Sequence, residues 1–305
     1  METPLLNHPA VWRGSELFAR PDWIHKFETA DWLAIRNSLE NGSGAVLVRG
    51  FPVDDFSRDE ARAGFLELCR ERLGTPVSQN DAGDLVFDVA DSGFKSDDPR
   101  ARGPNTKKKL SFHTDRCDVI AFLCWRQAKT GGENEIVSSM TLYNRIREQR
   151  PDLLKILCQP FVYKRHTVDL GNEKPYCEQP VFSFCDGHFA ANFLRVLIDR
   201  ADSDPDLPNL SAAQKEAMDF LEEVAGDPEI HVRFRQEPGD ILLLNNWVTL
   251  HRRSAFEDHA EPEKKRCLFR VWLSMPNSRP LDPMFEDNYG AVEAGAIRGG
   301  MRART

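Results

Sequence analysis

The chain has 305 residues, of which 41% are hydrophobic and 29% are charged, and its formal net charge is −8. This composition is typical of a globular protein with a sizeable apolar core. The acidic balance makes a nucleic acid or an anionic membrane surface an unfavourable partner, because like charges repel. No apolar run approaches the roughly 20 residues that cross a bilayer, and the N-terminal residues lack the basic and apolar regions of a signal peptide, so we expect a cytoplasmic protein.

The N-terminal part of the chain is expected to alternate helices with short strands. Asn41-Gly42 is a typical helix end, and Ser57 with Glu60 has the spacing of a capping box. The expected elements, in chain order, are a helix, a buried strand, a helix and a strand: 29–40, 45–51, 57–73 and 84–91.

Residues 92–110 are polar, rich in glycine, proline and charge, and have no apolar periodicity. They are expected to form a loop. Because this loop runs directly into the histidine-containing segment discussed below, it is either a plain surface loop or an active-site lid.

The rest of the chain is expected to be rich in strands. A helical stretch broken at Pro151, a capped helix after Ser211 and a fraying tail beyond about 285 complete the pattern. The expected strands are 119–125, a pair within 129–139, short runs between 161 and 193, 240–251 and 266–275.

Many short strands with helices at the N-terminus and in a central insertion favour a mainly β protein with α insertions. We expect a jelly roll or barrel-like core decorated by helices. No convincing boundary divides the chain, so we expect one domain over 1–305, with its core at about 40–280 between an N-terminal extension and a C-terminal tail. The odd cysteine count, seven, and the absence of a CxxC pair predict reduced, mostly buried thiols.

His113-Thr114-Asp115 is the first motif with metal-binding potential. In a strand, residues i and i+2 point to the same face, so His113 and Asp115 can aim an imidazole and a carboxylate at one point. On its own the motif is weak evidence, because a surface histidine beside a solvated aspartate is the more common case.

His251 strengthens the metal hypothesis, because two histidines and one carboxylate are the ligand set of non-haem Fe(II) oxygenases. It ends the apolar run 240–251, in which strand alternation would put Asn245, Trp247 and Thr249 on the same face. Such a polar, bulky face is typical of a pocket wall. The alternative is a histidine whose hydrogen bonds are satisfied at a strand end.

Arg266 and Arg270 fall on one face of the strand 266–275, and the opposite face is apolar: Cys267, Phe269, Val271 and Leu273. An inward arginine suits the far carboxylate of a dicarboxylic 2-oxo acid, because its planar fork binds carboxylates at two points. The alternative, two exposed arginines on an edge strand, fits the apolar opposite face poorly.

The ordered segments resemble the taurine dioxygenase (TauD/TfdA-like) superfamily of Fe(II)/2-oxoglutarate oxygenases, which includes clavaminate synthase-like and γ-butyrobetaine hydroxylase-like enzymes. The similarity spans roughly 40–280 and rests on HTD (113–115), TGGENEIVSS (130–139), PGDILLLNNWVTLH (238–251) and RCLFR (266–270). It implies a double-stranded β-helix, or jelly roll, with a helical insertion. It also implies Fe(II), 2-oxoglutarate and O₂ as cofactor and co-substrates.

By this resemblance, His113, Asp115 and His251 are the iron ligands and catalytic centre, and Arg266 binds 2-oxoglutarate. Asn134 stands where relatives often have threonine or serine, and its amide can also donate to a carboxylate. The candidate substrate-binding residues are Arg270, Trp247, Asn245 and His166.

The implied reaction is oxidation, most often hydroxylation, of a C–H bond in a small anionic or amino-acid-like molecule, with release of succinate and CO₂. Two alternatives are a non-catalytic metal-binding jelly roll and a cupin-type enzyme with zinc or nickel. The sequence leaves open the substrate, the choice among hydroxylation, desaturation and cyclisation, and whether the chain forms a homo-oligomer.

Overall fold

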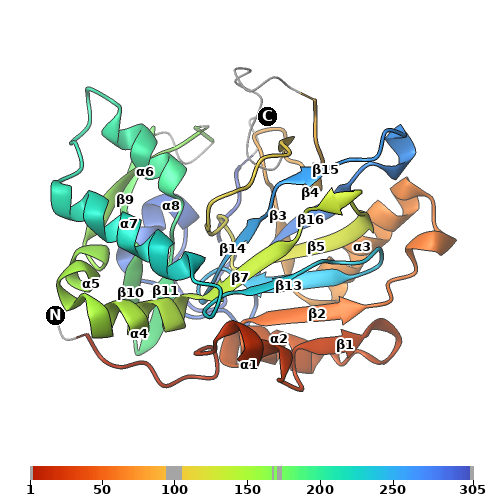
Figure 1. The fold of residues 1–305 in the computed structure, drawn as a ribbon, viewed down its shortest axis with the longest axis horizontal. Coiled ribbons are helices and arrows are strands. Elements are labelled where there is room, and N and C mark those ends of the chain that lie inside the picture. Colours follow the sequence, from red (N-terminus) through yellow and green to blue (C-terminus); the bar gives the residue numbers. More distant parts are fainter. Residues whose placement is uncertain (1–2, 94–104, 167, 170–173, 303–305) are drawn as a thin grey trace.

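The computed structural model describes residues 3–93, 105–166, 168–169 and 174–302 (Figure 1). The α-helices in these ranges are α1 (Gly14–Phe18), α2 (Trp32–Asn41), α3 (Arg58–Arg72), α4 (Ser139–Gln149), α5 (Pro151–Leu157), α6 (Arg195–Asp202), α7 (Ala212–Gly226) and α8 (Glu286–Tyr289). The strands are β1 (Ile24–Lys26), β2 (Ala45–Arg49), β3 (Thr75–Val77), β4 (Val86–Val89), β5 (Val119–Arg126), β6 (Thr130–Gly131), β7 (Asn134–Ser138), β8 (Pro160–Lys164), β9 (Tyr176–Pro180), β10 (Phe182–Cys185), β11 (His188–Ala191), β12 (Val232–Phe234), β13 (Ile241–Asn245), β14 (Thr249–Arg253), β15 (Phe256–Glu257) and β16 (Cys267–Ser274).

The larger sheet has the order β1-β2-β13-β5-β16-β3, with β4 also paired to β16. Its pairs are antiparallel except β1 with β2. One face carries Val46, Phe269 and Leu273, which pack with Ile35 of α2 and Phe65 of α3. Burial of this apolar surface is the main force that holds both helices on the sheet.

The opposite face of the larger sheet packs against a smaller antiparallel sheet, β12-β7-β14. Their shared core includes Phe122 and Leu268 from the larger sheet and Ile136 and Val232 from the smaller one. Helices α4–α7 lie together on the left in Figure 1, away from the large sheet on the right. They pack around a third apolar core. The two facing sheets position the site described below.

Several local signals in the sequence are confirmed. Ser57 with Glu60 and Ser211 with Gln214 form capping boxes at α3 and α7. The helical stretch breaks at Pro151, which begins α5 immediately after α4. The alternation of β16 is also confirmed, because its Cys267, Phe269, Val271 and Leu273 belong to one core and its Leu268 and Trp272 to another.

The prediction of one continuous strand over 240–251 is wrong. The carbonyl of Asn245 accepts from the amide of Val248 (3.2 Å), and its side-chain oxygen accepts from the amide of Trp247 (2.8 Å). This Asn-centred turn ends β13, and β14 begins at Thr249 in the other sheet. Asn245 and Trp247 therefore do not share a strand face with His251.

The prediction that the tail frays is also wrong for residues 286–302. Arg298 is 2% exposed. Its Nε donates to Oδ1 of Asp118 (2.7 Å), and its Nη2 donates to the carbonyl of Arg279 (2.8 Å). A buried, paired arginine fixes the end of the chain against β5.

Most of the predicted loop 92–110 lies outside the described residues, because 94–104 is not among them. All seven cysteines are free thiols, and five of them are buried, as expected for reduced side chains. Among the described helices, none is both long enough and apolar enough to cross a membrane.

Candidate metal centre

His113 and His251 are brought together by an isolated antiparallel bridge next to the smaller sheet. The amide of each residue donates to the carbonyl of the other at 3.0 Å. The two imidazole centroids are 4.5 Å apart. His251 lies in β14 opposite Ile136 of β7, and its ring meets the edge of Phe122 in β5. The pair therefore lies between the two sheets.

Asp115 completes the group. Its Oδ2 is 3.5 Å from Nε2 of His251, and its amide donates to the side chain of Asn246 (2.9 Å) in the turn between β13 and β14. Each of His113, Asp115 and His251 offers one ligand atom within 4.8 Å of the others. The hypothesis that HTD and the distant histidine converge is therefore supported by the geometry.

The donor atoms fit a divalent metal. Oδ2 of Asp115 is buried without a hydrogen-bond partner, a costly state for a polar atom that a bound metal would relieve. Nδ1 of His113 lies 2.9 Å from the carbonyl of Ser111. Since a carbonyl only accepts, Nδ1 carries the proton and Nε2 is left with a free lone pair for a metal.

The protonation states also suit metal binding. Burial, with a smaller effect of His251, lowers the pKa of His113 to about 4, so this imidazole is neutral at pH 7. Burial alone would raise the pKa of Asp115, but Arg270 and the two histidines lower it below its usual range. A neutral imidazole and an ionised carboxylate are the forms that ligate metals.

Arg270 reaches this centre from β16. Its Nη1 is 3.6 Å from Oδ1 of Asp115, and its guanidinium lies 5.0 Å from each of the ring centroids of Phe87 and Trp272. Gln79, which the sequence analysis missed, accepts from Nε of Arg270 (2.7 Å) and donates to its carbonyl (2.7 Å). The structure thus places a fixed cation beside the candidate metal ligands.

Arg266 lies just before β16, the strand that carries Arg270. It is 2% exposed, and its Nε and Nη1 have no hydrogen-bond partner. Burial lowers its pKa to about 10, which leaves the side chain charged at pH 7. A buried cation with free donors is a strong attraction for an anion.

Arg253 is a second buried arginine near Arg266 that the sequence analysis missed. It follows His251 by two positions in β14, and both guanidinium groups lie over the ring of Phe256, at 4.6 Å for Arg253 and 5.2 Å for Arg266. Burial, then the charge of Arg266, lowers the pKa of Arg253 to about 9. Its Nη2 donates to the carbonyls of Thr106 and Lys108, which anchors the segment leading into HTD.

The other candidate residues lie elsewhere. Asn134 begins β7, and its amide donates to Gln236 (3.0 Å). Asn245 donates to Glu40 (3.1 Å), and Trp247 donates to Asp118 (2.8 Å). Both residues are buried, and these hydrogen bonds hold parts of the core together. His166 is exposed after β8. Within the described residues, the side-chain hydrogen bonds of Asn134, Asn245 and Trp247 go to residues other than the three candidate ligands.

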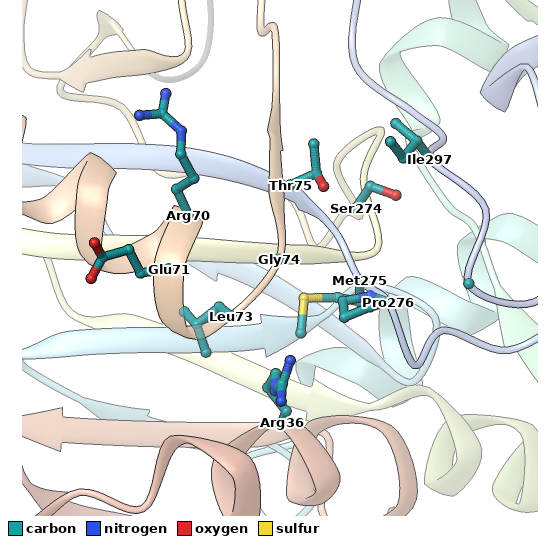
Figure 2. Close-up of a pocket in the computed structure, with 11 residues that line it drawn as sticks. Arg36, Arg70, Glu71, Leu73, Gly74, Thr75, Ser274, Met275, Pro276 and Ile297 are labelled. Carbon is teal, nitrogen blue, oxygen red and sulfur yellow. The ribbon is translucent and has the colours of Figure 1, made fainter.

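A surface pocket of about 340 Å³ is separate from the metal centre. Figure 2 shows its lining, which comes from α2, the end of α3, the ends of β3 and β16, and the C-terminal segment. Its charged members are Arg36, Arg70 and Glu71. None of the three candidate metal ligands takes part.

Two facing sheets that hold two histidines and one carboxylate, with a buried arginine nearby, define the class of non-haem Fe(II) oxygenases. Comparison with known proteins agrees. Residues 19–272 match the model of the taurine catabolism dioxygenase TauD, TfdA family, and the chain belongs to this family. It is an Fe(II)/2-oxoglutarate-dependent oxygenase that uses Fe(II), 2-oxoglutarate and O₂, which confirms the class and cofactors inferred from the sequence.

Individual relatives extend the comparison. FR-33289 synthase of Streptomyces rubellomurinus is 31% identical over 262 residues, which cover 85% of this chain and 77% of that protein. Human gamma-butyrobetaine dioxygenase is 29% identical over 172 residues, covering 51% and 42%. Among solved structures, asparagine oxygenase in complex with Fe(II), hydroxyasparagine and succinate superposes with a TM-score of 0.62 at 18% identity, covering 80% and 78%. At that identity the superposition supports the fold alone.

Proposed function

We propose that His113, Asp115 and His251 hold the Fe(II) and that the chain oxidises, most often by hydroxylation, a C–H bond of a small anionic or amino-acid-like molecule. The observation that carries this proposal is the convergence of the three ligand atoms within 4.8 Å, from segments far apart in the sequence. Three protein ligands leave three positions of an octahedral ion for 2-oxoglutarate and O₂. The facing sheets support our further proposal that the core is a double-stranded β-helix.

Arg266 is proposed to bind the distal carboxylate of 2-oxoglutarate. Its free Nε and Nη1 provide the donors for a two-point contact, and burial strengthens the attraction by excluding water. Gly132 helps to leave room, because a Cβ there would come within 3.2 Å of Nε of Arg266. Asn134 stays a weaker candidate, since its amide already donates to Gln236.

Arg270 is proposed to bind an anionic group of the substrate. Its guanidinium is held by Gln79 and lies beside Asp115, so an anion bound there would sit next to the metal. Solved relatives of the same fold are described in complex with hydroxyasparagine and with (3S)-hydroxy-L-Arg. These names support a substrate with a carboxylate near the oxidised carbon. Asn245, Trp247 and His166 are less favoured as substrate contacts, given where they lie.

The chain's own contribution to the reaction is orientation and exclusion of water. Fe(II) and 2-oxoglutarate, when bound, supply the oxidation: 2-oxoglutarate and O₂ become succinate and CO₂ as one oxygen atom enters the substrate. Ser111 fixes the tautomer of His113, and Arg270 keeps Asp115 ionised. The rings of Phe87, Phe122 and Trp272 surround the polar groups and limit access of water.

The proposal is tested by succinate release in a screen of small carboxylates, sulfonates and amino acids, each paired with its uncharged amide or ester. Stimulation by anionic members and not by their neutral partners is expected. Equal stimulation by both would contradict the role of Arg270 without affecting the enzyme class. Metal binding without stimulation by any member of the screen would contradict the proposed substrate class.

A further inference from the structure

The C-terminal segment Arg298–Arg302 crosses the region beside the candidate metal centre. Residues 77–79 and 115–117 lie on either side of this segment, which hydrogen-bonds to both. The first of these stretches carries Gln79, which holds Arg270, and the second begins with Asp115.

Two backbone hydrogen bonds make the connection. The amide of Gly300 donates to the carbonyl of Arg116, and the amide of Met301 donates to the carbonyl of Ser78, each at 2.7 Å. Arg116 directly follows the candidate ligand Asp115, and Ser78 directly precedes Gln79. The segment is therefore bonded within one residue of Asp115 and within one residue of Gln79, whose side chain holds Arg270.

A third contact brings in the region after β8. Oδ2 of Asp169 accepts from the amide of Arg302 (2.9 Å), and its Oδ1 accepts from Nη1 of Arg116 (3.2 Å). The carboxylate of Asp169 is fully buried. The Asp169 carboxylate thus contacts both the C-terminal segment and Arg116, so the region after β8 is tied to both of them.

Two glycines make this close passage possible. A Cβ on Gly299 would lie 2.6 Å from the carbonyl oxygen of Arg116. A Cβ on Gly300 would lie 2.7 Å from Cβ of Val77, and the φ of +69° at Gly300 already disfavours other residues. The segment is thus built to fit tightly between its two neighbours.

We propose that Arg298–Arg302 is a strap that sets the position of Arg270 relative to Asp115 and closes the substrate side of the centre. Arg298 anchors the strap on Asp118, and residues 300–302 are positioning residues that act through Ser78, Arg116 and Asp169. The proposal rests on the proposed function, because it assigns the Asp115–Arg270 side to the substrate. Loss of the strap should loosen that side and leave the binding of iron and 2-oxoglutarate in place.

The test compares Gly300→Val and a deletion of residues 299–305 with a matched control, Gly187→Val. Gly187 also has a positive φ, +80°, but a Cβ there would meet nothing within 4 Å, so the control shares the backbone strain without touching the strap. Hydrogen–deuterium exchange of the metal-free proteins should become about tenfold faster in peptides covering 77–85 and 113–118 for both strap variants, and not for the control.

Two further measurements separate this idea from the proposed function. The anaerobic absorption band formed with Fe(II) and 2-oxoglutarate should be unchanged, while succinate formation without substrate should change by roughly two- to thirtyfold in the strap variants. Unaltered hydrogen–deuterium exchange and unaltered succinate formation in the strap variants would contradict the proposed role of the strap. Loss of cooperative unfolding in both variants would also overturn it, because the segment would then be part of the core. Absence of the band in the wild type would instead refute the proposed function.

Discussion

The side-chain amide of Gln79 hydrogen-bonds to both the side chain and the backbone of Arg270. Its Oε1 accepts from Nε of Arg270, and its Nε2 donates to the carbonyl of Arg270, each at 2.7 Å. The same Nε2 also donates to the carbonyl of Leu85 at 3.0 Å. This arrangement fixes a guanidinium next to the proposed metal-binding carboxylate of Asp115 before any substrate arrives, and such preorganisation reduces the entropy lost on binding.

Replacement of Gln79 should therefore weaken substrate binding. In Gln79→Leu the side chain of Arg270 loses its acceptor, and a hydrogen bond to a charged group contributes roughly 1.5–3 kcal/mol. The KM of an anionic substrate should rise by about one to two orders of magnitude with little change in the 2-oxoglutarate requirement. Steady-state kinetics on both co-substrates measures this, and a KM that stays at the wild-type value would contradict the role of Gln79.

Removal of Arg266 should act on the other co-substrate. Arg266→Gln takes away the buried cation, and loss of one partner of a buried charge pair costs roughly 2–5 kcal/mol. The 2-oxoglutarate concentration for half-saturation should rise by about two orders of magnitude, while iron stays bound. Arg70→Ala is the control, because its side chain is 49% exposed and pairs with Glu67, which is 53% exposed. If Arg266→Gln leaves the requirement unchanged, Arg253 becomes the better candidate.

The ligand assignment predicts a thermal-shift result that needs no turnover. A metal that binds the folded state alone stabilises it by about 2.7 kcal/mol at 100 times its Kd. Anaerobic Fe(II) should therefore raise the Tm of the wild type and leave that of His113→Ala unchanged. His188→Ala is a matched control, because His188 is an exposed histidine in the β10–β11 hairpin. An equal shift in both histidine variants would refute the assignment of His113.

Arg298 should matter for stability more than its position near the C-terminus suggests. Arg298→Ala leaves the carboxylate of Asp118, which is 1% exposed, without its cation, and a broken buried pair typically costs about 3–5 kcal/mol. Chemical denaturation should show a loss of this size, with part of it recovered in the double variant with Asp118→Asn. A loss below about 1 kcal/mol, as at an exposed pair, would contradict the role of Arg298.

His113 and Asp115 could be proposed as ligands from the sequence because they lie in one local pattern, whereas His251 was proposed from a strand over 240–251 that the structure divides into β13 and β14. His113 and Asp115 have strand spacing, and the alternation of β16 separated Arg266 and Arg270 from an apolar face. Pro151 and the two capping boxes likewise act within a few residues of the chain. Short-range sterics and hydrogen bonding are readable without tertiary context.

The missed features depend on contacts between distant segments. Gln79 meets Arg270 across 191 positions, and Arg298 meets Asp118 across 180. The Gly- and Arg-rich tail has the composition of a flexible end, yet its glycines allow close passage and Arg298 finds a buried partner. The turn at Asn245 was hidden because its side chain bonds to the backbone inside a run that is otherwise typical of a strand.

The central claim is that His113, Asp115 and His251 form one iron site that accepts 2-oxoglutarate, and anaerobic absorption spectroscopy tests it most directly. Fe(II) and then 2-oxoglutarate are added to the wild type, His251→Ala and the surface control Arg70→Ala. We predict a visible metal-to-ligand charge-transfer band that requires both additions, persists in Arg70→Ala and disappears in folded His251→Ala. A well-folded wild-type protein that forms no band, or a His251→Ala variant that keeps it, would contradict the claim.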